Sequence, residues 1–343
     1  MKKKVLIIGP IPPPAGGVSI HINRLAHILK PYFEIRLIDE SRIPKPGILN
    51  IRKFNVFGYL RAIGSSHIVH IHSGTRSLKY LHILVSRLLG KKTILTIHSL
   101  KKGSSAFKTR LDGWIYSLPQ LTIMVNGDFK NRIRLTNKTL VKEAFLPPVL
   151  EGEPALPEAM AAWLNEKKKL GYQVAVANAW RLDTFKGEDL YGLDLCINAV
   201  QRFKKEGKLI CLVYVVSDLG GQLDIETYQK QIEELDLTDV FYLQKSQISF
   251  VNLVQMSDIV LRPTNTDGDA LTVREALYLG KCVIASDVVQ RPVGTELFKT
   301  RDAASLAEAI KDQAALTPKK AGLNGHGQTD YGKFYQEIYS KLN

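Results

Sequence analysis

Short apolar runs alternate with longer amphipathic stretches along the chain, and this rhythm predicts β-strands that alternate with α-helices. The predicted strands of the first half are residues 4–9, 33–38, 66–72, 93–98 and 121–125. Residues 19–29 and 78–89 are predicted helices. Strands that are apolar throughout are typical of parallel sheets covered on both faces.

The same rhythm begins again after a proline-bearing linker from Pro147 to Pro157. The predicted strands of the second half include residues 174–178, 209–216, 240–243, 258–261 and 282–285. Its predicted helices are residues 193–205, 224–235 and 302–313, with a last helix at 331–342. The sequence therefore predicts an α/β fold of two Rossmann-like doubly wound domains that face one cleft. We expect these domains at residues 1–165 and 166–325, with a closing helix in residues 326–343.

The length and cysteine content fit this picture. A chain of 343 residues exceeds the usual size of one domain. Its longest apolar runs, such as residues 81–89, are too short to cross a bilayer. Cys196, Cys211 and Cys282 lie in apolar contexts without a metal-binding spacing, which predicts reduced core residues in a cytosolic protein.

Charge is distributed very unevenly. Residues 1–150 contain 25 Lys and Arg against 6 Asp and Glu, a net charge of +19, whereas the remainder contains 22 against 27, a net charge of −5. Segments 51–61 and 101–114 mix cations with aromatic side chains, as segments at an anionic membrane interface do. Solvated helix faces are the competing interpretation. Nucleic acid is a weaker one, because the basic segments fit no recognition module.

One βαβ unit at residues 259–287 holds two carboxylates. Asp267 lies in the loop after a predicted strand, and Glu275 lies in the helix that follows. Open α/β sheets bind ligands at this end of their strands, and unpaired N–H groups at a helix start suit a diphosphate. Those N–H groups belong to Leu271, Thr272 and Val273. Carboxylates beside an anion site fit a ligand with both phosphates and hydroxyls, such as a nucleotide sugar.

Two further loops carry groups suited to phosphate. Gly16 and Gly17 precede the first predicted helix, where bare backbone lets N–H groups approach a phosphate, although an ordinary Pro/Gly turn explains them equally well. Arg181 and Lys186 follow the first strand of the second half. The Arg guanidinium can donate two parallel hydrogen bonds and the Lys ammonium adds a single positive charge, and both suit a diphosphate. Solvated loop charge is the alternative for these two cations.

His72 and His98 each end a predicted strand of the first domain. A histidine in this place is more often packed or hydrogen-bonded than catalytic. No His-x-x-x-His spacing and no Asp or Cys partner supports a metal, so the sequence predicts no metal site. The sequence does not support a serine hydrolase, because it contains no G-x-S-x-G nucleophile motif.

In their order along nearly the whole chain, these motifs resemble the retaining glycosyltransferases of the GT-B fold, family 4. Gly16-Gly17 resembles the N-terminal glycine loop of that family, residues 69–72 its acceptor-side strand, and residues 96–98 its active-site histidine. Arg181 with Lys186 resembles the diphosphate clamp. Asp267 and Glu275, with seven residues between them, resemble the paired-carboxylate motif.

The resemblance implies a role for each site residue. Glu275 would bind the ribose hydroxyls, Asp267 and His98 would contact the donor sugar, and His72 would lie on the acceptor side. The diphosphate would be held by Gly17, Arg181, Lys186 and the N–H groups of residues 271–273. The base would lie near Lys245, Ser246 and Gln247. Catalysis would need no metal or other cofactor, and a front-face mechanism with retention is favoured because no protein nucleophile is evident.

The sequence departs from the family pattern in one place. Asp267 stands where the family usually has Glu, and Asp269 and Ala270 stand where it has a Phe-Gly pair. Asp269 either reads a sugar hydroxyl or caps the helix. Together with Arg291-Pro292, the pattern resembles a branch found among bacterial surface-polysaccharide enzymes.

The resemblance implies a glycosyltransferase that moves a sugar, UDP-linked, from a nucleotide sugar to a lipid-linked or polysaccharide acceptor. The basic first domain would rest on an anionic membrane, so that the protein is cytoplasmic and peripheral on the inner face. A nucleotide-sugar epimerase of the same fold is the alternative. Nucleic acid is not an expected partner.

Overall fold

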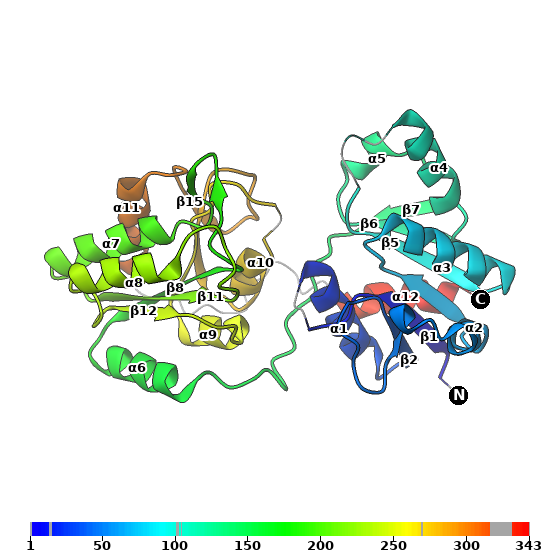
Figure 1. Ribbon diagram of the computed structural model, residues 1–343, viewed down its shortest axis with the longest axis horizontal. Coiled ribbons are helices and arrows are strands. Elements are labelled where there is room, and N and C mark those ends of the chain that lie inside the picture. Colours follow the sequence, from blue (N-terminus) through cyan, green and yellow to red (C-terminus); the bar gives the residue numbers. More distant parts are fainter. Residues whose placement is uncertain are drawn as a thin grey trace. The chain divides into compact units, whose positions relative to one another are not determined.

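The computed structural model describes residues 2–13, 16–100, 103, 105–268, 270–315 and 331–342, the last range without the Tyr331 side chain. The chain divides into two compact units, whose helices and some of whose strands are labelled in Figure 1. The N-terminal unit comprises Met1–Pro147 and Gln328–Asn343, and the C-terminal unit comprises Pro148–Gly327. Each unit is built on one parallel sheet, as the sequence predicts.

The N-terminal sheet has seven strands in the order β3-β2-β1-β4-β5-β6-β7, and every neighbouring pair is parallel. The strands are β1 (Lys4–Gly9), β2 (Glu34–Asp39), β3 (Leu49–Asn50), β4 (Ile68–Ile71), β5 (Lys92–Ile97), β6 (Leu121–Met124) and β7 (Lys138–Val141). The helices are α1 (Gly17–Leu29), α2 (Val56–Gly64), α3 (Arg76–Leu88), α4 (Ala106–Tyr116), α5 (Phe129–Arg132) and α12 (Tyr331–Lys341), with a 3₁₀ turn η1 (Ile51–Lys53).

Alternate residues of β1 enter two different cores, because successive side chains of a strand point to opposite faces. Val5 and Ile7 pack in the core that includes buried residues of α1 and α12. Leu6 and Ile8 pack in the core that includes buried residues of α2, α3 and α4. Both faces of the sheet are therefore covered, which explains why its strands are apolar throughout.

The C-terminal sheet has six strands in the order β12-β11-β8-β13-β14-β15, again all parallel. The strands are β8 (Gln173–Ala179), β11 (Ile210–Val216), β12 (Phe241–Gln244), β13 (Ile259–Arg262), β14 (Cys282–Ser286) and β15 (Thr295–Phe298). The helices are α6 (Glu158–Lys169), α7 (Leu193–Lys205), α8 (Ile225–Glu234), α9 (Phe250–Met256), α10 (Leu271–Tyr278) and α11 (Ala303–Ala315). A small hairpin pairs β9 (Thr184–Phe185) with β10 (Glu188–Asp189).

The predicted elements recur with boundaries shifted by a residue or two, but the division between the units differs from the prediction. It falls after Pro147, ahead of the boundary expected after residue 165. The reason is α6, whose Met160 and Leu164 are fully buried in the core of the C-terminal unit. The closing helix α12 returns to the N-terminal unit, where Tyr335 and Tyr339 are buried in the core shared with α1, the helix beside it in Figure 1.

Within the part of the chain that the structure describes, we find no helix that has both the length and the apolar character to cross a membrane.

Two loops of the C-terminal unit meet backbone to backbone at Gly192. This residue precedes α7 with a φ of 69°, and a Cβ atom on it would lie 2.3 Å from the carbonyl oxygen of Pro263. Pro263 directly follows β13, whereas Gly192 ends the segment that follows β8. Glycine is required here both by its conformation and by the close approach.

We predict that Gly192→Ala lowers the free energy of unfolding by about 2–4 kcal/mol, because the positive φ and the clash both act against it. Gly207→Ala is the matched control, since Gly207 has a φ of 64° and no atom within 4 Å of its added Cβ. This control should cost about 1–2 kcal/mol. Urea unfolding of both variants measures the difference, and equal losses would show that the contact with Pro263 contributes nothing.

Candidate active site

In the C-terminal sheet, the direction in which successive strands are added reverses between β8 and β13. The chain runs outward from β8 through β11 to β12, and then continues on the other side of β8 with β13. The loops after two such strands diverge, and the crevice between them is where open α/β sheets bind ligands. Arg181 and Lys186 follow β8, and Asp267 follows β13, so the structure brings these predicted residues to one edge of one sheet.

Lys186 lies at the tip of the β9–β10 hairpin, an element that the sequence did not predict. Lys186 and Gly187 form its two-residue turn, with φ values of 54° and 81°. Positive φ at both positions is what two-residue hairpin turns of type I′ require. The Lys186 side chain is exposed, and its Nζ lies 5.6 Å from the centroid of the Phe185 ring. The hairpin thus presents a cation to solvent.

The hairpin is attached to the loop that follows β13. The Asn265 backbone N–H donates to the Leu190 carbonyl at 3.1 Å, and the Asn265 side-chain amide donates to the Phe185 carbonyl at 3.2 Å. These bonds fix the hairpin relative to the loop that holds Asp267. Arg181 lies on the same side of the sheet, half-exposed, with its Nε 3.5 Å from a carboxylate oxygen of Asp183.

Asp267 is held by two arginines. Its Oδ1 and Oδ2 accept a bidentate pair from Arg262, both at 3.0 Å, and Oδ2 also accepts from Arg291 at 2.7 Å. Burial favours the neutral acid, but the hydrogen bonds and charges of the arginines outweigh it and lower the pKa of Asp267 to about 2. A contact between Asp267 and the donor sugar, as the resemblance implies, would have to share these oxygens with the arginines.

The start of α10 differs in part from the prediction. Ala270 takes the N-cap position, and its methyl group cannot accept a hydrogen bond from the first turn. The Val273 N–H, expected to be unpaired, donates to the Ala270 carbonyl at 3.1 Å. Of the three N–H groups predicted for an anion, those of Leu271 and Thr272 remain as candidates. Glu275 is buried within α10, and Asp269 lies outside the described residues.

Lys245, Ser246 and Gln247 follow β12 at the edge of the sheet, on the side predicted for the base. Ser246 and Gln247 are exposed. The Lys245 ammonium bonds to both carboxylate oxygens of Glu226 at 2.8 Å each. Its charge is therefore engaged within the protein, and Ser246 and Gln247 are the members of this group with exposed side chains.

In the N-terminal sheet, the order in which strands are added reverses between β1 and β4. The predicted site residues of this unit follow β1, β4 and β5 at the same edge. Gly16 is the N-cap of α1, and a Cβ atom on Gly17 would meet no atom within 4 Å. The packing of the protein does not demand glycine at position 17, which suits a place that a ligand approaches. Gly9 differs, because a Cβ there would lie 2.6 Å from Ile22 and 3.2 Å from the Cβ of His72.

His72 follows β4 and His98 follows β5, and the two rings are hydrogen-bonded, with His72 Nδ1 3.0 Å from His98 Nε2. The sequence analysis missed a third histidine beside them, His21 of α1, whose ring centroid lies 5.2 Å from that of His72. Burial lowers the pKa of all three imidazoles, that of His21 to about 4, so they are neutral at pH 7. The signal was present in the sequence, since His21 lies one helical turn after Gly17.

Comparisons with known proteins agree with this geometry. Residues 187–317, within the C-terminal unit, match the family described as Glycosyl transferases group 1. Among solved structures, a glycosyltransferase from Rickettsia africae ESF-5 superposes with a TM-score of 0.69 at 16% identity, and covers 99% of this chain and 98% of its own. The chain has the GT-B fold.

Two further structures with this fold are similar along their whole length. Anabaena Alr3699/HepE, solved in complex with UDP and glucose, gives a TM-score of 0.64 at 15% identity over 99% of both chains. The lipopolysaccharide outer core galactosyltransferase WaaB, solved in its apo form, gives 0.60 at 15% identity over 98% of this chain and 99% of its own. No curated protein matches the sequence. The match and the fold together support glycosyltransferase as the enzyme class.

We predict that Asp267→Asn lowers the free energy of unfolding by about 3 kcal/mol at pH 7, because it leaves the mostly buried side chains of Arg262 and Arg291 without their counter-charge. The folded pKa of Asp267 is below the ordinary 3.8, so its ionised form stabilises the protein above that pH, and this contribution is lost as the pH falls toward 2. The gap between wild type and variant should therefore shrink between about pH 4 and pH 2.

Chemical unfolding across this pH range measures that gap. Asp312→Asn is the control, because Asp312 is an exposed carboxylate on α11 of the same unit. A gap that stays constant with pH would contradict the pairing of Asp267 with the arginines.

Proposed function

We propose that this protein is a retaining glycosyltransferase that moves a sugar from a UDP-linked donor to a lipid-linked or polysaccharide acceptor in cell-surface glycan synthesis. The observation that carries the proposal is the edge of the C-terminal sheet, where the segment after β8 carries Arg181 and the exposed Lys186 and the loop after β13 leads into α10. The family match, residues 187–317, begins just after these two cations and includes Asp267 and α10. The UDP and glucose named for HepE and the lipopolysaccharide core named for WaaB support the donor and acceptor classes.

The cations supply what the leaving group needs. When a glycosidic bond to a diphosphate breaks, negative charge grows on the diphosphate, and groups held in place for that charge stabilise the transition state. Arg181 provides a fork of donors, Lys186 a point charge, and the start of α10 provides backbone N–H groups. We propose that these groups bind the diphosphate without a metal and without another cofactor.

The state of Asp267 disfavours a covalent glycosyl intermediate on this carboxylate. A carboxylate that accepts bonds from two arginines, with a pKa lowered to about 2, is a weak nucleophile. The acceptor hydroxyl would instead attack from the face on which the diphosphate leaves, with catalysis resting on position and charge. The roles that the resemblance gives to Glu275, His72 and His98 remain predictions. An epimerase is not favoured, because the matching family is one of transferases.

We also propose that the N-terminal unit rests on an anionic membrane at the cytoplasmic face. Helices α2, α3 and α4 contact one another through Tyr59 with His82 and through Asp112 with Arg76 and Tyr80. Together they expose apolar side chains away from the core. These are Phe54, Val56, Phe57 and Leu60 around α2, Leu81, Leu84 and Leu88 on α3, and Phe107 and Trp114 on α4.

Cations surround these apolar side chains. Arg52, Lys53, Arg61, Lys108 and Arg110 are exposed on the same segments, so the surface combines apolar insertion with charge attraction. Lys101 and Lys102, which belong to the predicted basic segment, lie outside the described residues. The α3 leucines extend this surface beyond the two segments that the sequence singled out.

We predict that Arg181→Gln and Lys186→Asn each lower kcat/KM for transfer by ~100-fold or more, because each removes a charge from the diphosphate site. Asparagine at 186 tolerates positive φ and keeps the hairpin. The assay uses radiolabelled UDP-sugars with a lipid acceptor and follows label into the lipid phase. Lys230→Asn on α8 is the control. Wild-type rates in both site variants would reject the clamp, and sugar interconversion without acceptor would support the epimerase.

We predict that Phe57→Ser combined with Trp114→Ser reduces sedimentation with vesicles of anionic lipid several-fold, because both exposed side chains, 88% and 63% accessible, lose their apolar surface. Binding of the wild type should weaken as salt rises. Leu219→Ser is the matched control, an exposed apolar residue of the C-terminal unit. Equal vesicle binding by the double variant and the control would show that Phe57 and Trp114 do not enter the membrane.

A further inference from the structure

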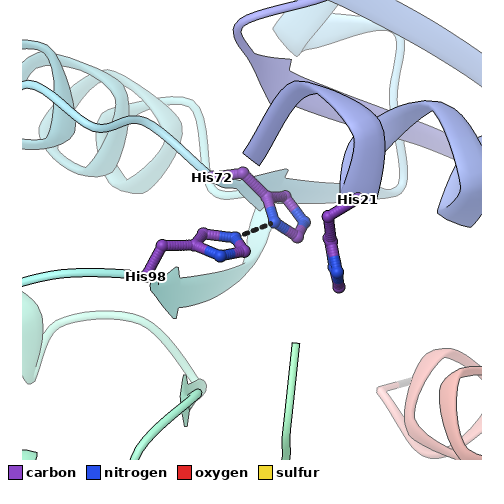
Figure 2. Close-up of side chains that lie close together, drawn as sticks. All are labelled: His21, His72 and His98. Atoms are coloured by element: carbon purple, nitrogen blue, oxygen red, sulfur yellow. Dashed lines mark hydrogen bonds between the residues drawn. The ribbon is translucent and has the colours of Figure 1, made fainter. Parts of the chain in front are cut away.

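Three imidazole rings from separate elements meet at the carboxyl edge of the N-terminal sheet, as Figure 2 shows. His21 comes from α1, His72 from the segment after β4, and His98 from the segment after β5. Their ring centroids are separated by 5.2 Å, 5.0 Å and 5.3 Å, so the rings form a nearly equilateral triangle. One nitrogen from each ring lies within 4.8 Å of the nitrogens of the other two.

The hydrogen bonds of these rings leave nitrogens without partners. His21 Nδ1 lies 2.6 Å from the Ala144 carbonyl, which can only accept, so Nδ1 carries the proton and Nε2 carries a lone pair. Within the described residues, His21 Nε2 and His72 Nε2 are buried and have no hydrogen-bond partner. A buried polar atom left in this state costs about 1–3 kcal/mol, which a ligand at the cluster would offset.

Two other buried histidines of the N-terminal unit, His70 and His82, differ, because their ring nitrogens have hydrogen-bond partners. His70 bonds to Tyr339 at 2.5 Å through Nδ1 and to Thr96 at 2.8 Å through Nε2. His82 bonds to Tyr59 at 2.7 Å and to Glu40 at 2.9 Å. Both nitrogens of each of these rings are satisfied by the protein. Among the buried histidines that the structure describes, the unpartnered nitrogens therefore belong to the triangle.

We propose that His21, His72 and His98 form a binding site for one Zn²⁺ ion. Imidazole nitrogens are preferred ligands of zinc, and sites with three protein ligands leave a fourth position for water or another small ligand.

Two features of the triangle support zinc. The bond from His21 Nδ1 to the Ala144 carbonyl fixes the ring with Nε2 available, the arrangement that metal-binding histidines usually have. Tetrahedral zinc with bonds of ~2.0–2.1 Å needs nitrogens roughly 3.3 Å apart, so the side chains must close by at most about 1.5 Å.

The proposed zinc site goes beyond the proposed function and does not depend on it. Sequence reasoning excluded a metal because no ligand spacing was visible, and the structure shows why: the three histidines come from elements that are neighbours only in the folded sheet. If His98 also contacts a donor sugar, zinc and the sugar would compete for its ring. Zinc would then inhibit transfer, which a titration of the transfer reaction can detect separately.

The test uses the full chain without a histidine tag, treated with a chelator and dialysed before Zn²⁺ is added. We expect saturable binding of about one Zn²⁺ per chain by calorimetry and by metal analysis, together with a rise in Tm. Co²⁺ should replace zinc and give the visible d–d absorption of a four-coordinate site. His21→Gln should weaken binding at least ~10–100-fold. His27→Gln, an exposed histidine on the same helix, is the matched control and should bind normally.

Every result bears on the proposal. Absence of saturable zinc binding in the wild type would falsify it, and so would zinc binding that survives in both His21→Gln and His72→Gln. Should a variant fail to fold, as circular dichroism would reveal, the Co²⁺ spectrum of the wild type still tests the site. If the chain transfers sugar but binds no zinc, the zinc site is rejected and the proposed function is retained.

Discussion

The burial of both faces of each parallel sheet constrains everything else in this protein. With helices on both sides, the middle of a strand has no route to solvent, and a polar group there would need a partner inside the core. His70 of β4 shows this, since it is fully buried and both its nitrogens are bonded to Tyr339 and Thr96. Chemistry is therefore displaced to the carboxyl ends of the strands, where loops diverge and ligands can enter.

The two units use that edge in different ways. In the C-terminal unit the central carboxylate, Asp267, is fully paired with Arg262 and Arg291, and the exposed cations stand on a hairpin and loop around it. The ion pairs of Asp267 fix the loop, while Lys186 is exposed to solvent and the half-exposed Arg181 lies 3.5 Å from Asp183. In the N-terminal unit the buried groups at the edge are neutral imidazoles, two of which keep a nitrogen without a partner. The first arrangement suits an anion, and the second suits a cation.

The basic part of the sequence maps to one group of helices in the N-terminal unit. The acid-free stretch from residue 41 to 111 includes α2, α3 and the start of α4, which cover one face of the N-terminal sheet and expose aromatic and leucine side chains. An amphipathic helix normally keeps such residues inside. Their exposure on three neighbouring helices, with cations between them, is the physical basis for the membrane surface that we propose.

The sequence by itself determined the order and type of the main elements, because the period of apolar residues is a local property that each strand and helix carries in its own segment. It also determined that Arg181, Lys186 and Asp267 follow strand ends and that Glu275 lies in the helix after one of them. Only the tertiary structure decided which side chains meet. The arginine partners of Asp267 are 5 and 24 residues away from it, the hairpin under Lys186 is held by Asn265, and α6 joins the C-terminal core. His21, His72 and His98 come together because the ends of β4 and β5 and the first turns of α1 converge at a single edge, and such convergence depends on contacts distant in sequence.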